Sequence, residues 1–395
     1  MNMRVKLSEL GTVITGNTPS KQEQKYWTSS DIPFIKPDII SQNEITELQS
    51  ANEYVSDAAR SKARIVGKGV VLVTCIGTIG KICLTGRECA FNQQINAIVP
   101  NEKVLPEYLA YCIYYNRYKL AEIANAPVVP IINKSQFEEF YVSIEKDVEL
   151  QRKILLILRR ASALVSYRQH QLQKLDELVK ARFVEMFGEP ISNPLGWPVK
   201  RLNDISSLIT NGNTPKGGSD NYVNEGIIFL RSQNVWRNKI DLDDVAYIDA
   251  ATHAEMSKSS VHDKDILITK TGRINTENSS LGRAALFRGA DNSANINGHV
   301  YLVRLDGTTM PEYVVAILTG EPYRRYIRKV CVGGIDKRQI NLDQVEDFPI
   351  ILPPIELQQQ FTAFVEQVDK LKVAVQKALD EAQLLFDSLM QKYFE

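Results

Sequence analysis

Residues 149–187 read ELQRKILLILRRASALVSYRQHQLQKLDELVKARFVEMF, and residues 356–394 read ELQQQFTAFVEQVDKLKVAVQKALDEAQLLFDSLMQKYF. In the first stretch apolar side chains recur in alternating steps of four and three residues, which is the spacing of a coiled-coil helix. The same stripe returns 207 residues later in the second stretch. The positions expected to form the helix-pairing seam are Ile154, Leu158, Val165, Leu172, Leu175 and Val179, with Phe361, Val365, Val368, Val375, Leu379, Phe386 and Leu389.

An apolar stripe on a long helix must be buried against a partner, and two equivalent stripes in one chain can bury each other. The stripes themselves leave the orientation open, but two copies related by a pseudo-two-fold axis favour an antiparallel pair. The first helix is mainly basic and the second mainly acidic. This difference in charge supports their pairing in either orientation, although each exposed ion pair contributes under ~1 kcal/mol.

The remainder of the chain also contains an internal repeat. Residues 7–10 and 15–19 return as residues 202–205 and 210–215, which contain the same Thr, Gly, Asn and Pro signals. Further matches follow in order: residues 32–36 with 227–231, 79–84 with 281–286, 106–108 with 311–313, and 149–151 with 356–358. These ordered matches establish an internal duplication, which decides how the chain divides into domains.

Each copy consists of a globular part followed by a long helix. Strand-like runs rich in β-branched residues, such as Val70–Val73, are separated by Gly, Asn and Thr turns. Helices are expected from Pro106 to about residue 120 and from Pro311 to about residue 330, because proline suits a first helical turn. The predicted class is α+β, with two repeated mixed α/β domains and two antiparallel coiled-coil helices in pseudo-two-fold symmetry. The expected boundaries are domains 1–148 and 197–352, helices 149–188 and 353–395, and a linker 189–196.

The bulk properties narrow the class of protein. A chain of 395 residues has room for two or three domains, and it lacks an apolar run of the ~18 residues that cross a bilayer. Five cysteines without CxxC spacing predict neither disulfides nor a zinc site. Together with the lack of a membrane-spanning run, this pattern leads us to expect a cytoplasmic protein with no membrane contact. The formal net charge is zero, whereas proteins that grip duplex DNA alone are usually basic. Either the protein does not bind DNA, or its basic face is local and partner subunits supply much of the phosphate contact.

Several motifs together resemble one family. The junction in residues 186–198 contains Gly-Glu-Pro, Asn-Pro and Gly-Trp-Pro, and the second helix is entered through Leu352-Pro353-Pro354 and the Glu-x-Gln of residues 356–358. With the duplication, these motifs resemble the DNA-specificity subunit of type I restriction-modification systems over essentially the whole chain. The first helix entry, residues 144–151, departs from that pattern because it lacks the double proline.

The resemblance implies two target-recognition domains, each reading one half of a bipartite, asymmetric site in double-stranded DNA. It also implies that the helices set the gap and recruit two methyltransferase subunits, and that motor-nuclease subunits join the full complex. Those partners would use S-adenosylmethionine, ATP and Mg²⁺, and no cofactor is expected in this chain. At 1.5 Å per residue, a helix of ~36 residues spans roughly 54 Å, which suits a ruler between half-sites.

The sequence lacks the catalytic motifs expected of a DNA-modifying enzyme. The Asn/Asp-Pro-Pro-aromatic motif and Gly-rich cofactor loop of an adenine methyltransferase are missing. Residues 77–82 fail the spacing of a phosphate-binding P-loop, and the four histidines are scattered. We therefore predict a subunit with no catalytic residues and no metal site. The alternatives are a non-enzymatic protein–protein adaptor with duplicated domains, and the recognition half of an enzyme whose catalytic region lies elsewhere on the same chain.

Candidate DNA contacts are polar and basic residues on loops, especially where the repeats differ. Arg or Lys suits guanine, and Asn or Gln suits adenine. Thr74 and Thr269 are 195 residues apart but Ile79 and Leu281 are 202 apart, so the second copy has seven extra residues, placed within 270–278. A solvated loop of variable length explains the same stretches equally well. The candidates are Lys36, Lys81, Asn92, Gln93, Gln94 and Lys134 in the first copy, and Arg231, Gln233, Asn234, Arg237, Lys270, Arg273, Asn275, Lys337 and Arg338 in the second.

Overall fold

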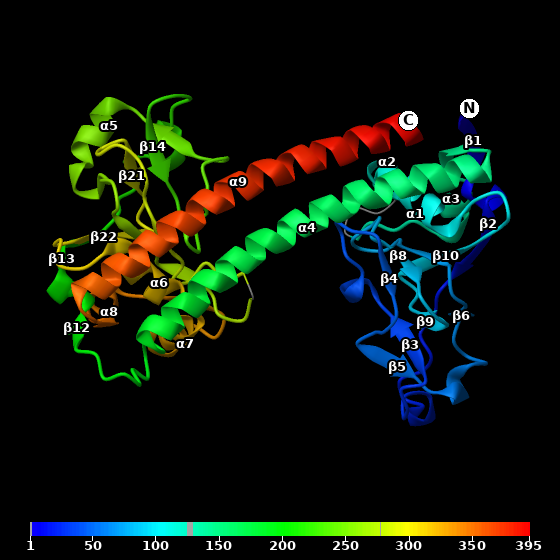
Figure 1. The fold of residues 1–395 in the computed structure, drawn as a ribbon, viewed down its shortest axis with the longest axis horizontal. Coiled ribbons are helices and arrows are strands. Elements are labelled where there is room, and N and C mark those ends of the chain that lie inside the picture. Colours follow the sequence, from blue (N-terminus) through cyan, green and yellow to red (C-terminus); the bar gives the residue numbers. More distant parts are fainter. Residues whose placement is uncertain (1, 125–128, 277) are drawn as a thin grey trace. The chain divides into compact units, whose positions relative to one another are not determined.

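The computed structural model describes residues 2–124, 129–276 and 278–395, which form two compact units. Unit 1 comprises Met1–Gln169 with Gln376–Glu395, and unit 2 comprises His170–Val375. Each unit therefore contains one globular repeat and one half of each long helix, α4 (Val148–Phe187) and α9 (Ile355–Phe394), drawn in Figure 1. No helix in the described part of the chain is long and apolar enough to span a membrane.

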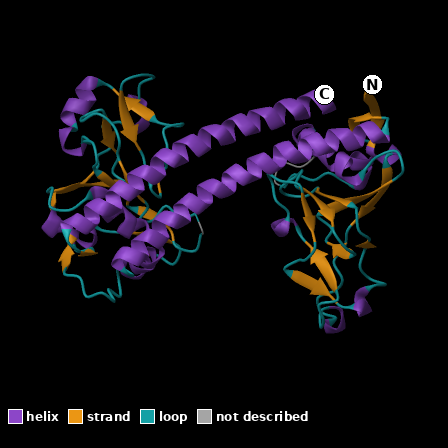
Figure 2. Cartoon of the chain, viewed as in Figure 1, coloured by secondary structure: helices purple, strands orange, loops and turns teal. Residues whose placement is uncertain are grey.

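The globular part of unit 1 contains two sheets and a closing strand pair (Figure 2). A five-stranded sheet has the order β2-β10-β7-β8-β4, and a four-stranded sheet has the order β5-β3-β9-β6. The first and last strands, β1 and β11, pair antiparallel and bring the two ends of this part together. The strands are β1 (Asn2–Lys6), β2 (Gly11–Thr15), β3 (Ile32–Ile35), β4 (Thr46–Leu48), β5 (Glu53–Val55), β6 (Ile65–Val66), β7 (Val71–Thr74), β8 (Ile82–Thr85), β9 (Cys89–Phe91), β10 (Ile95–Pro100) and β11 (Tyr141–Glu145).

Unit 2 repeats this plan. Its sheets have the orders β13-β22-β18-β20, β17-β14-β21, β19-β24-β23, β15-β16 and β12-β25. The parallel pair β3 and β9 of unit 1 has its counterpart in the parallel pair β14 and β21. The strands are β12 (Val199–Arg201), β13 (Ser206–Asn211), β14 (Ile227–Leu230), β15 (Val235–Trp236), β16 (Lys239–Ile240), β17 (Ala246–Ile248), β18 (Ile266–Thr269), β19 (Thr271–Arg273), β20 (Ala284–Leu286), β21 (Ala294–Ile296), β22 (Val300–Leu305), β23 (Val332–Gly333), β24 (Lys337–Gln339) and β25 (Pro349–Ile351).

Short helices cover the sheets in both units. Pro106 and Pro311 each occupy a first helical turn, as predicted. Proline suits this position because the N–H group that it lacks would have no hydrogen-bond partner within the helix. Each predicted helix is interrupted, at Asn116 and at Gly320, and so becomes two helices. The helices are α1 (Pro106–Tyr115), α2 (Arg117–Glu122) and α3 (Lys134–Glu138) in unit 1, and α5 (Ala250–Glu255), α6 (Pro311–Thr319), α7 (Glu321–Val330) and α8 (Leu342–Glu346) in unit 2.

The Thr, Gly, Asn and Pro signals of the two repeats mark a close approach of two backbone segments. A Cβ atom at Gly16 would lie 2.1 Å from the carbonyl oxygen of Asn92. A Cβ at Gly212 would lie 2.2 Å from the carbonyl oxygen of Asn297. Real side chains cannot make such contacts, so glycine at the end of β2 and β13 is a steric requirement of both repeats.

The two long helices pack antiparallel in each unit. In unit 1, Ile154 and Leu158 near the start of α4 share a core with Phe386 near the end of α9. In unit 2, Phe183 at the end of α4 shares a core with Phe361 at the start of α9. The start of one helix therefore meets the end of the other, and the predicted antiparallel α+β architecture is confirmed.

The predicted seam positions all lie on covered faces of the helices. Ile154, Leu158, Phe361, Val365, Val368 and Phe386 are buried, and Val165, Leu172, Leu175, Val179, Val375, Leu379 and Leu389 are half-buried. Lys372 interrupts the stripe on α9, and its Nζ lies 2.6 Å from Oδ1 of Asp176 on α4. This ion pair joins a basic residue of the acidic helix to an acidic residue of the basic helix, opposite to the overall charge difference.

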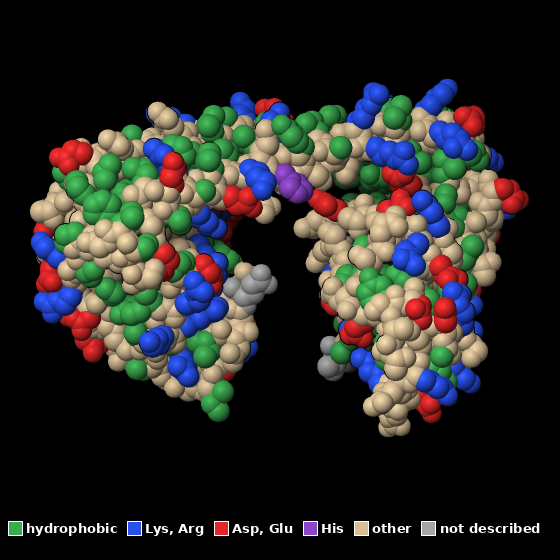
Figure 3. All heavy atoms as spheres, turned by 60° about the horizontal axis from the view of Figure 1, so that its bottom comes forward, with side chains coloured by type: hydrophobic (Ala, Val, Ile, Leu, Met, Phe, Trp, Pro, Cys, Tyr) green, Lys and Arg blue, Asp and Glu red, His purple; other side chains and the backbone are tan. Residues whose placement is uncertain are grey.

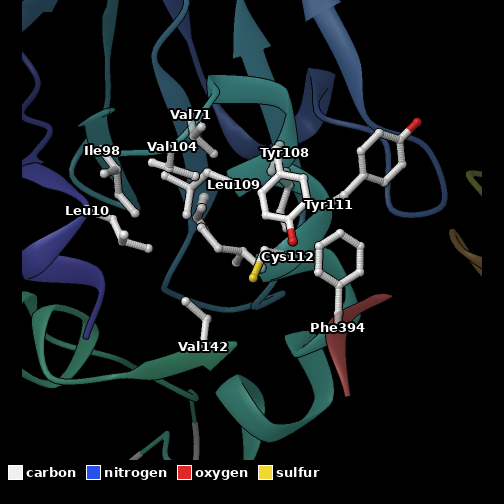
Figure 4. Packing of buried hydrophobic residues seen from close by; sticks show 14 of the residues in the cluster. Leu10, Val71, Ile98, Val104, Tyr108, Leu109, Tyr111, Cys112, Val142 and Phe394 are labelled. Carbon is white, nitrogen blue, oxygen red and sulfur yellow. The ribbon is translucent and has the colours of Figure 1, made fainter. Parts of the chain in front are cut away.

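An aromatic side chain at the end of each long helix packs against the matching tyrosine of a globular part. The rings of Phe394 and Tyr108 lie 5.1 Å apart, and those of Phe187 and Tyr313 lie 4.9 Å apart. Figure 4 shows Phe394 reaching the side chains of α1 in the core of unit 1. Each globular core is thus completed by the end of the long helix that follows the other repeat.

A buried glutamine fixes the start of each long helix. Gln151 is fully buried; its Oε1 accepts from the Leu105 amide at 2.9 Å, and its Nε2 donates to the Glu145 carbonyl at 2.7 Å. Gln358 accepts in the same way from the Met310 amide at 3.1 Å. Because buried backbone groups need hydrogen-bond partners, these two side chains explain the Glu-x-Gln motif at both helix entries.

Candidate nucleic-acid interface

In the first repeat, the loop between β7 and β8 presents Lys81 beside the segment after β3. Its Nζ donates to the carbonyl oxygen of Pro37 at 3.0 Å. Gly77 and Gly80 adopt φ of +77° and +82°, so the loop is a tight turn with two left-handed positions. The Gly77 amide donates to the Pro130 carbonyl at 3.0 Å, which ties the turn to the segment before α3.

Lys36 follows β3 and forms an ion pair with Glu53 in β5. The hydrogen bond to Glu53 raises the pKa of Lys36, and the same hydrogen bond lowers the pKa of Glu53. Both side chains are about one-third exposed. The Lys36 ammonium group is therefore paired with a carboxylate of the same protein, but the side chain still lies at the surface.

The Asn92-Gln93-Gln94 segment is the turn between β9 and β10. Asn92 is buried, and its Oδ1 accepts from the Gln94 amide at 3.1 Å while its Nδ2 donates to Gln94 Oε1 at 2.9 Å. Gln93 is exposed and accepts from Thr18 Oγ1 at 2.7 Å. Lys134 is exposed in α3 and lies 3.4 Å from Glu138. The structure thus separates a side chain that holds the turn, Asn92, from surface side chains, Gln93 and Lys134.

In the second repeat, Asp244 contacts two of the candidate DNA-contact residues that follow β14. It lies 3.2 Å from Arg231 and accepts from Gln233 Nε2 at 2.8 Å. Asn234 is buried and donates to the carbonyl oxygens of Asp241 and Asp244, so it holds the loop. Arg231 matches Lys36 in the repeat, and both are paired with a carboxylate.

A small three-stranded sheet brings together candidates that are distant in sequence. Pairing of β19 with β24 places Arg273 opposite Lys337 and Gly272 opposite Arg338. Arg273 lies 3.4 Å from Asp336, and the Arg338 Nε donates to the Gly334 carbonyl at 3.1 Å. The insertion and the Gly-rich turn of the second repeat therefore form one surface.

The other candidates of this repeat lie near that sheet or on nearby loops. Lys270 precedes β19, and its Nζ lies 5.6 Å from the centre of the Tyr301 ring. Asn275 and Arg237 are exposed. Glu277, which belongs to the predicted insertion, lies outside the described residues. Figure 3 shows Lys and Arg side chains gathered on a face of unit 2, the left part of that view.

The predicted contacts Gln233 and Arg273 line a hollow of about 360 Å³ in unit 2. Trp236 and Arg283, which were not among the predicted contacts, line the same hollow. We call it the second-repeat hollow; Asn278 and four Ser or Thr residues complete its lining. Arg283 is only 7% exposed, and its guanidinium carbon lies 3.9 Å from the centre of the Trp236 ring. Its repeat match to Lys81, a predicted contact, was the signal that could have identified it.

The guanidinium of Arg283 lies in a basic environment. Burial lowers the pKa of Arg283, and the nearby positive charges of Arg237 and Arg324 lower it further. An arginine nonetheless remains protonated in proteins, so the hollow holds a permanent positive charge. Across the described residues there is no group of three or more His, Cys, Asp or Glu side chains that could hold a metal ion.

Comparison with known proteins gives consistent results. The family model for the type I restriction modification DNA specificity domain matches residues 2–177 and 194–382. The specificity subunit of the type I restriction enzyme MjaIX from Methanocaldococcus jannaschii is 24% identical over 413 residues, which cover 98% of this chain and 91% of that protein. The specificity subunit of type I restriction enzyme HindI from Haemophilus influenzae is 38% identical over 104 residues, 26% of this chain and 22% of that protein.

The chain also resembles a solved structure over its full length. The type I restriction-modification S subunit from M. genitalium covers 100% of this chain and 96% of its own, with a TM-score of 0.57 and 12% sequence identity. At this identity the likeness concerns the fold.

Proposed function

Because the chain belongs to the type I restriction-modification DNA specificity family, we propose that it is the DNA-sequence-specificity subunit of a type I restriction-modification complex. The observation that carries this proposal is the family match to both repeats, residues 2–177 and 194–382, each of which includes a globular part and most of a long helix. Each globular domain reads one half of a bipartite, asymmetric site in double-stranded DNA, and the helices set the gap between the halves.

The predicted contacts divide into two groups by their surroundings. Gln93, Lys134, Gln233, Arg237, Arg273, Asn275 and Lys337 are exposed, and we assign them to direct contact with bases or phosphates. Lys36, Lys81, Asn92, Gln94, Arg231, Asn234, Lys270 and Arg338 are buried or half-buried, and we assign them to holding the recognition loops. Arginine and amide side chains on such loops have the paired donors and acceptors that direct readout in the major groove requires.

The partners supply the chemistry. Two methyltransferase subunits would bring S-adenosylmethionine, and motor-nuclease subunits would bring ATP and Mg²⁺, so this chain has no catalytic role. Exposed apolar side chains on the long helices suit contact with such subunits, among them Leu156 and Leu384 in unit 1 and Leu371 and Val373 in unit 2. Partner subunits would also account for phosphate binding by an assembly whose specificity chain has zero net charge. A complex of this kind acts on DNA in the cytoplasm.

The test is to express the chain with its methyltransferase partner and to map N6-methyladenine across host DNA. We expect methylation of a single two-part motif. Replacing residues 1–148 with the equivalent domain of another specificity subunit should change one half of the motif, and replacing residues 197–352 should change the other half. If no motif is methylated and no methyltransferase co-purifies, the protein–protein adaptor is the better description and the proposal fails.

A further inference from the structure

The second-repeat hollow has the composition of a nucleobase site. Its lining combines two arginines, the amides Gln233 and Asn278, four hydroxyl side chains and the indole of Trp236. None of the described residues that line it carries a carboxylate. The described part of this surface therefore offers hydrogen-bond donors and one aromatic plane.

Arg283 is held rigidly at this hollow. Its Nε donates to the Ser279 carbonyl at 3.0 Å, and its Nη2 donates to the Asn278 carbonyl. Trp236 lies against the face of the guanidinium, with 3.9 Å between the guanidinium carbon and the ring centre. Two hydrogen bonds and one stacking contact therefore fix both the position and the plane of the guanidinium before any ligand arrives.

The two hydrogen bonds occupy only the side edge of the guanidinium, the edge formed by Nε and Nη2. The end edge, formed by Nη1 and Nη2, has two parallel N–H groups, and no described residue accepts a hydrogen bond from Nη1. Paired donors of this geometry match an acceptor pair such as O6 and N7 of guanine, the commonest partner of arginine in the major groove.

We propose that the end edge of the Arg283 guanidinium reads one guanine of the half-site bound by the second repeat, with Trp236 as the platform that orients it. This inference rests on the proposed DNA-specificity function and names a base and its reader. A backbone phosphate can also accept both N–H groups of a guanidinium edge. The amide and hydroxyl side chains and the indole that line the hollow beside Arg283 favour a planar base over a phosphate. The Trp236 ring and the two backbone carbonyls hold the plane of the Arg283 guanidinium in one orientation.

The first repeat provides an internal contrast. The matching residue, Lys81, has an ammonium group that donates to the Pro37 carbonyl, and residues 36–42, which match residues 231–237, contain no tryptophan. An ammonium is a point donor and lacks the paired, planar edge of a guanidinium. The two half-sites should therefore differ in that only the second has a guanine whose recognition depends on this position.

The experiment uses the complex of the full chain with its methyltransferase subunits and a duplex DNA library with random bases. The wild type should select one bipartite motif containing a guanine in the second-repeat half. Arg283→Lys should reduce discrimination at one G·C pair by about ten- to hundredfold and leave the other positions unchanged. Trp236→Ala, which removes an exposed side chain, should weaken the same position. Arg87→Lys changes an exposed arginine in the turn after β8 and should leave both half-sites unchanged.

A second measurement does not depend on the folding of any variant. Oligonucleotides with 7-deazaguanine at the identified position lack the N7 acceptor, so they should bind the wild type less tightly than normal DNA does. If Arg283→Lys instead weakens binding equally across all sequences, with no loss of discrimination at one G·C pair, the residue contacts a phosphate and the inference is overturned. If the wild type selects no motif, the proposed function itself fails and the inference fails with it.

Discussion

The two repeats share their buried side chains and differ in their exposed polar ones. Tyr108 and Tyr313 occupy matching core positions, and each packs against a phenylalanine at the end of a long helix. In contrast, Lys81 donates to a single carbonyl, whereas the matching Arg283 stacks on an indole and is held by two carbonyls. Packing imposes the same demands on both copies, so they share their core, whereas the proposed reading of two different half-sites requires their polar surfaces to differ.

The exchange of helix ends is the central part of the shared scaffold. The core of unit 1 includes the end of α9, and the core of unit 2 includes the end of α4. Each globular part therefore depends on the helix that follows the other copy. If this comparison is correct, matched substitutions in the two units should have matched effects, and substitutions at the polar surface should not.

The largest effect is expected from truncating the aromatic side chain at either helix end. Phe187→Ala and Phe394→Ala should each cost about 3–5 kcal/mol, because both remove a buried ring and leave a cavity. Hydrogen exchange measures this loss within each unit: amides of α6 should lose protection in the first variant, and amides of α1 in the second.

Val373→Ala is the matched control for this pair, because Val373 is a 73% exposed apolar residue of the same helices. Its effect should stay within about 0.5 kcal/mol. A large loss of protection in one unit and none in the other would show that the two helix ends are not equivalent, and it would break the comparison.

An intermediate effect is expected at the buried glutamines. Gln151→Met and Gln358→Met keep the volume but remove the acceptor of a buried backbone amide, which should cost about 1–3 kcal/mol. The exchange rates of the Leu105 and Met310 amides report the lost hydrogen bond directly. Gln173→Met, at an exposed position of α4, is the control. Unchanged protection of both amides would mean that the Glu-x-Gln motif does not anchor the helices.

Much of the fold could be predicted from sequence because it depends on periodicity and repetition. The stripes that start at Ile154 and Phe361 required a buried helix pair, and the duplication required two similar globular parts. Sequence periodicity did not reveal the partner of each helix end, since the contact of Phe187 with Tyr313 joins residues distant in the chain. It also missed the breaks at Asn116 and Gly320, which divide each predicted covering helix into two.

The candidate contacts could be predicted only as loops. Whether a basic side chain is available depends on carboxylates supplied by other segments: Glu53 pairs with Lys36, Asp244 with Arg231 and Asp336 with Arg273. Those pairings arise from tertiary structure and have no local signature. The hollow around Arg283 was missed for the same reason, because Trp236 reaches it from β15, which is distant from Arg283 in the sequence.

The smallest effect is expected at Lys36 and Arg231, the matching basic residues that each pair with a carboxylate. Lys36→Met removes the partner of Glu53, so the pKa of Glu53, which the hydrogen bond from Lys36 holds below its ordinary value, should rise. The pair should contribute under ~1 kcal/mol because both side chains are about one-third exposed. An NMR titration of the Glu53 carboxyl group measures the change, and Arg231→Met in the other repeat should leave it unaltered.

The pH dependence gives this last prediction its sign. A carboxyl group with a lowered folded pKa stabilises the protein above its unfolded pKa of about 4.3 and loses that contribution as the pH falls through the folded pKa. Lys36, with a raised pKa, contributes until the pH rises above about 10.4 and through its own folded pKa. The difference in stability between the wild type and Lys36→Met should therefore be constant from pH 6 to 8 and should shrink at both extremes. A difference that persists at low pH would show that the lysine stem packs against unit 1 and that the charge pair is incidental.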